Sequence, residues 1–66
     1  MPDYVAVARN LFFRSQVNPD KHPELVTEYR NRMLAIPLKA GHPQALLSLQ
    51  EQILAEIASK FPHGDK

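Results

Sequence analysis

The chain has 66 residues, of which 44% are apolar, a net charge of +1 and no cysteine. This length allows one small domain, and the absence of cysteine excludes disulfides and thiolate zinc sites. A nucleic-acid-binding domain of this size usually carries a larger basic excess. Proteins shorter than roughly 80 residues without disulfides or metals are commonly stabilised by another subunit, so we expect association with a partner.

The first predicted helix covers residues 4–16. "YVAV" at its start would also suit a β-strand, but no partner strand is apparent elsewhere, so we predict a helix. At 100° per residue, Phe13 points away from the apolar side and is expected outside the core. The apolar side itself is formed by Tyr4, Val5, Ala8, Leu11 and Phe12, with Val7 beside them.

Two of the three histidines directly precede a proline, in "HPEL" and "HPQA". Proline is favoured at the first helical position, and an acid or amide after it suits the first turn. We therefore interpret His22 and His42 as cap residues at two helix starts. A metal site would need three or four converging ligands, and only these two histidines, His63 and Asp20 are candidates. We predict no metal and no cofactor.

The second predicted helix covers residues 23–36 and ends before a proline. Leu34 falls nearly opposite its apolar stripe, so we expect this leucine to be exposed. The stripe is formed by Leu25, Val26, Tyr29, Met33 and Ile36, and its width is typical of a surface helix.

The third predicted helix covers residues 43–61, and residues 62–66 are expected to form a flexible tail. Its apolar residues are spread over about half of the circumference, which is wider than one neighbouring helix covers. Gln50 lies near the centre of this arc, where a polar side chain can set the register of association. The arc contains Leu46, Leu47, Leu49, Ile53, Leu54, Ile57, Ala58 and Phe61.

These segments predict an all-α fold with two to three short helices. We expect a helical hairpin with an additional N-terminal helix, within a single domain of residues 1–66, assembled as a dimeric helical bundle. Phe13 and Leu34 are either interface residues or simply exposed, since single exposed apolar residues are common. The predicted interface for self-association or a partner consists of Phe13, Leu34, Leu46, Leu47, Gln50, Ile53, Leu54, Ile57 and Phe61.

Nothing in the sequence favours an enzyme. The three serines belong to no recognisable nucleophile motif, the two glycines form no phosphate-binding loop, and the chain is small for a substrate cavity. We expect a cytoplasmic, non-enzymatic interaction module that has no membrane segment. It would be a homodimeric adaptor or inhibitor that docks on a larger cytosolic protein, such as a bacterial or phage-host regulatory protein. Its aromatic anchors would be Phe13, Tyr29 and Phe61.

The alternative function is a small DNA-binding transcriptional regulator. The better candidate for contacting DNA is the second predicted helix, with Arg30 and Arg32, whereas Glu51 and Glu56 on the third helix would be repelled by phosphate. A solvated basic face is the simpler interpretation of these charges. The candidate nucleic-acid contacts are Arg9, Arg14, Arg30, Arg32 and Lys39.

Overall fold

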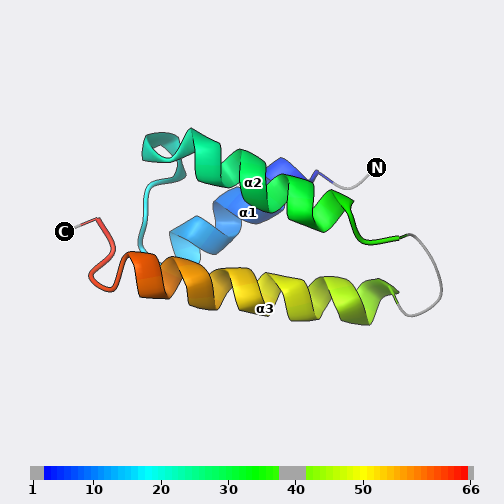
Figure 1. The fold of residues 1–66 in the computed structure, drawn as a ribbon. Coiled ribbons are helices and arrows are strands. Elements are labelled where there is room, and N and C mark those ends of the chain that lie inside the picture. The colour runs from blue at the N-terminus through cyan, green and yellow to red at the C-terminus, as the bar shows by residue number, and fades with distance from the viewer. Residues whose placement is uncertain (1–2, 38–41, 66) are drawn as a thin grey trace.

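The computed structural model describes residues 3–37 and 42–65, and this part of the chain contains three α-helices and no strand. They are α1 (Tyr4–Arg14), α2 (Pro23–Leu34) and α3 (His42–Lys60), with a short 3₁₀ helix, η1 (Pro19–Lys21), between the first two. The all-α prediction is confirmed for these residues. In Figure 1, α1 and α2 lie on the same side of the long helix α3, and α2 runs antiparallel to it. The molecule is elongated and measures 41 × 18 × 14 Å.

Helix α1 ends two residues before its predicted end because the chain makes a left-handed turn there. Gln16 has a φ of 60°, and its N–H donates to the carbonyl of Phe13 at 3.0 Å. The N–H of Val17 donates to the carbonyl of Phe12 at 2.9 Å. This pair of bonds is the Schellman helix ending, which usually has glycine at the left-handed position. Glutamine is not a helix-ending signal, so the pattern of apolar residues alone could not locate this turn.

The start of α2 follows the prediction from the His-Pro pair. Pro23 is its first residue and His22 its N-cap. The imidazole makes no capping hydrogen bond, and its ring lies 4.5 Å from the Phe61 ring and 6.1 Å from the Phe12 ring, measured between centroids. Helix α3 begins at His42, one residue before its predicted start, so this histidine is the first helical residue and not the predicted cap. The first histidine therefore marks a helix start and also packs between aromatic side chains.

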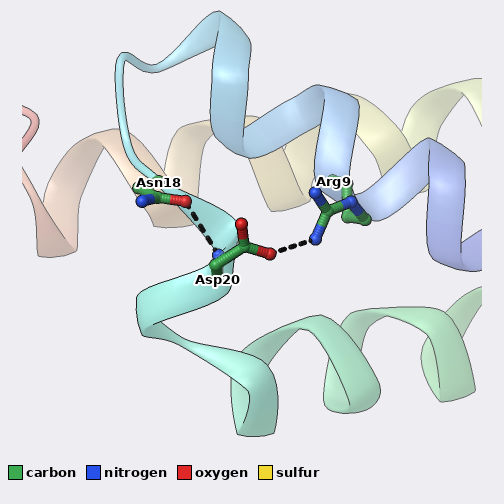
Figure 2. Close-up of polar contacts among 3 residues, drawn as sticks. All are labelled: Arg9, Asn18 and Asp20. Atoms are coloured by element: carbon green, nitrogen blue, oxygen red, sulfur yellow. Dashed lines mark hydrogen bonds and ion pairs between the residues drawn. The ribbon is translucent and has the colours of Figure 1, made fainter.

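The connection between α1 and α2 contains η1, which the spacing of apolar residues does not predict. The side-chain oxygen of Asn18 accepts a hydrogen bond from the N–H of Asp20 at 3.0 Å, and Pro19 is buried. The guanidinium of Arg9, on α1, contacts the carboxylate of Asp20 at 2.6 Å (Figure 2). Side-chain capping and this ion pair hold the connection against α1, although an exposed pair of this kind contributes little stability.

The three helices and the connection after α1 share one apolar core. Phe13 and Leu34 are exposed, as predicted, whereas Val5 was expected on the apolar side of α1 but is 39% exposed at its edge. Helix α3 contributes the two fully buried residues Ile53 and Ile57. The buried set is Tyr4, Ala8, Leu11, Phe12, Val17, Val26, Tyr29, Met33, Ile53 and Ile57.

Residues after α3 fold back onto the end of α1. The N–H of Asp65 donates to the carbonyl of Gln16 at 3.2 Å, and its carboxylate accepts a hydrogen bond from the N–H of Asn18. Gly64, with a φ of +65°, forms the turn that brings these groups together. The structure thus places residues 62–65 in a hydrogen-bonded turn, where a flexible tail was expected. The contacts are with residues distant in sequence, which a local pattern does not reveal.

Tyr29 is fully buried, and its hydroxyl has no hydrogen-bond partner within the part of the chain that the structure describes. Burial, and then the carboxylates of Glu56 and Glu28, raise its pKa above the ordinary value of 10.0, against an opposing effect of Arg32. Since an unpaired buried hydroxyl is unfavourable, we expect Tyr29→Phe to stabilise the protein by about 1 kcal/mol.

The same substitution has an expected pH dependence. Above pH 10 the unfolded state of the wild type ionises this tyrosine before the folded state does, which favours unfolding. Tyr29→Phe removes this contribution, so its stability advantage should grow as the pH rises through 10. Urea unfolding at pH 7 and at pH 10.5 measures both effects. A loss of stability at pH 7 would show that the hydroxyl is satisfied in solution.

Candidate interaction surfaces on helices α1 and α3

Helix α3 borders a groove that neither α1 nor α2 fills. The groove has a volume of about 330 Å³. Leu47 is 55% exposed, and Leu54 and Gln50 are half-buried. We call this surface the α3 groove; its lining residues are Arg14, Gln44, Leu47, Gln50, Glu51 and Leu54.

The position of the α3 groove follows from the way the other helices pack on α3. Ile53 and Ile57 mark the side of α3 that faces the core. Glu56, on one flank of that side, contacts Arg32 of α2 at 2.8 Å. Leu47 and Leu54 lie on the opposite flank, about 100° around the helix from the core side. Helix α2 therefore covers one flank of the apolar arc, and much of the other flank remains open.

The predicted interface residues of α3 separate into two groups. Ile53 and Ile57 are fully buried within the single chain, and Leu46 packs half-buried against the core. These residues stabilise the monomer and offer little surface to a partner. Leu47 and Gln50 line the groove, and Leu54 both lines the groove and packs half-buried against the core. An arc of apolar residues predicted from helical periodicity thus contains both core and groove positions.

The remaining predicted interface residues do not belong to the α3 groove. Leu34 is 40% exposed at the end of α2, and Phe61 is half-buried beside His22. Of the three aromatic residues expected as anchors, Tyr29 is fully buried and Phe13 is the most exposed. Phe13 is therefore the aromatic residue best placed to contact a partner.

A second apolar surface lies along the outer side of α1. Val5, Arg9 and Phe13 are spaced four residues apart and so lie on one face of the helix. The guanidinium of Arg9 lies 5.7 Å from the centre of the Phe13 ring and contacts Asp20. Its charge is therefore compensated, which leaves a largely apolar surface. We call it the α1 face; it borders a hollow of about 430 Å³ lined by Asp3, Val5, Ala6, Arg9, Asn10 and Phe13.

The predicted nucleic-acid contacts are divided between α1 and α2. Arg9 and Arg32 are each engaged by a carboxylate, so phosphate would have to compete with an ion pair. Arg14 and Arg30 are exposed on different helices. Lys39 lies outside the described residues. Two of the four described arginines are thus compensated within the chain.

In residues 3–37 and 42–65, no group of three or more metal-ligating side chains is placed to hold a metal ion. No described helix is long and apolar enough to cross a membrane.

The groove residues Arg14, Gln44 and Glu51 were not predicted as interface residues, because their role depends on the side of α3 against which α1 packs. No protein-family model, curated protein or solved structure matches the chain.

Proposed function

We propose that this protein is a non-enzymatic protein–protein interaction module that self-associates through the α3 groove. The observation that carries the proposal is the exposure of Leu47 in a groove whose floor includes the half-buried Leu54. Burying a leucine side chain fully is worth about 1.5–3 kcal/mol, and a two-fold dimer would cover both leucines in each of two copies.

The size of the chain supports the same proposal. A core of this extent in 66 residues stabilises a monomer only marginally, and association removes further apolar area from water. The 19 residues of α3 extend over about 28 Å, which is long enough for a helix-to-helix interface. Self-association would thus stabilise the fold and would also form the homodimer that is the functional unit.

The α1 face supports the second part of the proposal, in which the homodimer docks as an adaptor or inhibitor on a larger cytosolic protein. Val5 and Phe13 belong to this face and do not line the α3 groove. Association through the groove would therefore leave them available to another partner. Phe13 would serve as the aromatic anchor, since aromatic side chains supply much of the energy at interfaces.

Leu47→Glu should weaken self-association at least tenfold, because it places a charge in the proposed apolar interface. Leu47 is exposed in the single chain, so the variant should remain folded. Sedimentation equilibrium measures the dissociation constant, and circular dichroism confirms helicity. The matched control is Gln52→Glu, which adds the same charge at an exposed position on the far side of α3 and should leave the dissociation constant unchanged.

Equal dissociation constants for the wild type and Leu47→Glu would exclude the α3 groove as the interface. The DNA-binding alternative has its own test in fluorescence anisotropy with duplex DNA at low salt. Binding that weakens when Arg30 is changed to alanine, and that falls steeply with salt, would favour that alternative over the proposed function.

A further inference from the structure

We infer that two copies associate with their α3 helices parallel, about a two-fold axis that runs along the helices, so that Arg14 of each copy faces Glu51 of the other. This inference rests on the proposed self-association and specifies its geometry. It follows from the distribution of charge across the α3 groove and from the polar residue within its apolar seam.

The two charged residues of the α3 groove lie on opposite sides of its apolar seam, which is formed by Leu47, Gln50 and Leu54. Arg14 projects from α1, which packs against the core side of α3. Glu51 follows Gln50 by one residue, so it lies about 100° farther around α3 and away from that side. Both charged residues are exposed. Within the described residues, neither takes part in an ion pair.

Symmetry decides which charges meet when two such grooves come together. A two-fold axis along the helices exchanges the two sides of the groove and places Arg14 opposite Glu51 of the second copy. A two-fold axis perpendicular to the helices leaves each side facing its own counterpart, so that arginine would face arginine and glutamate would face glutamate. Opposite charges across an interface favour association and like charges oppose it. The groove is therefore self-complementary only in the parallel arrangement.

Gln50 fits the same arrangement. It lies between Leu47 and Leu54 at intervals of three and four residues, the spacing of a coiled-coil seam. In a parallel pair each seam residue meets its own counterpart, so Gln50 would meet Gln50. A side-chain amide both donates and accepts hydrogen bonds, so the two Gln50 side chains can hydrogen-bond to one another. A polar pair of this kind sets the register of the two helices.

Single-cysteine variants test this geometry directly, because the chain has no cysteine of its own. In the parallel arrangement, Leu47→Cys and Leu54→Cys should each form a disulfide-linked dimer with itself under mild oxidation. An antiparallel pair would instead join position 47 to position 54 in an equimolar mixture of the two variants. The same residues of an antiparallel pair would be offset by about 10 Å along the axis, too far for a disulfide.

The cross-linking is quantified by mass spectrometry with one of the two variants labelled with nitrogen-15, so that mixed and self-linked dimers differ in mass. Gln52→Cys, on the exposed far side of α3, is the control and should show only the background of random collisions. Self-linked dimers at both positions, well above this background, are the expected result. Predominantly mixed dimers would overturn the parallel arrangement.

Charge exchange gives an independent test. Arg14→Glu alone and Glu51→Arg alone should each raise the dissociation constant about tenfold, because each variant places like charges opposite one another twice. An equimolar mixture of the two should form a heterodimer with wild-type affinity, since both contacts are then restored. A wild-type dimer that neither variant weakens would overturn the inferred geometry while leaving the proposed function intact. A wild-type protein that stays monomeric would contradict both the parallel geometry and the proposed self-association.

Discussion

Phe12→Ala is expected to lower the free energy of unfolding by about 3–5 kcal/mol, the range found when a buried phenylalanine is deleted. Phe12 has no exposed surface, and its ring lies 5.8 Å from the Tyr29 ring and 6.1 Å from the His22 ring. It therefore joins α1 to α2 and to the connection between them, and its removal leaves a cavity at this junction. Because small domains are marginally stable, this loss is a large part of their total stability. Urea unfolding followed by circular dichroism measures it.

The neighbouring residue provides a matched control for this substitution. Phe13 is 55% exposed, so Phe13→Ala removes the same atoms without opening a cavity and should cost less than about 1 kcal/mol. Comparable losses for the two variants would contradict the orientation of α1 in this structure. Phe13→Ala should instead act on partner binding, because it removes the proposed anchor of the α1 face.

The second large effect is expected for Gly64→Ala, which should lower the free energy of unfolding by about 1–3 kcal/mol. Gly64 has a φ of +65°, where a side chain is strained, and an added Cβ would lie 2.6 Å from the carbonyl oxygen of Gln16. The C-terminal turn must therefore move away from α1. Asp65 would then lose its hydrogen bonds to Gln16 and Asn18.

Chemical unfolding and amide hydrogen exchange together test the role of this turn. In Gly64→Ala, the amides of Asn18 and Asp65 should exchange faster than in the wild type, because both donate hydrogen bonds at the junction. His63→Ala, at the exposed neighbouring position, is the control and should change stability by less than about 0.5 kcal/mol. Unchanged exchange in Gly64→Ala would show that the turn is not bound to α1 in solution.

The helices were predictable because their signals are local. Apolar residues recur at helical spacing, and the proline after His22 marks the start of α2. The end of α1 was not predictable, because it depends on a left-handed glutamine. The docked C-terminal turn was also missed, since Asp65 and its partner Asn18 are 47 residues apart in the sequence. Contacts between distant segments depend on the packing of the whole chain.

The candidate site was likewise predictable only in part from the sequence. The positions of Leu47 and Leu54 on an apolar arc wider than one neighbour covers were evident from their spacing along α3. The separation of that arc into core and groove was not, because it requires knowing which sides α1 and α2 occupy. The position of Arg14 beside the groove was not predictable for the same reason, since Arg14 belongs to another helix.

The most direct test of the proposed self-association is the molar mass of the wild-type protein, measured by size-exclusion chromatography with multi-angle light scattering over a range of concentrations. We expect the mass to rise with concentration to twice the 7.5 kDa of the chain. A mass that stays at 7.5 kDa up to millimolar concentration would contradict self-association through the α3 groove.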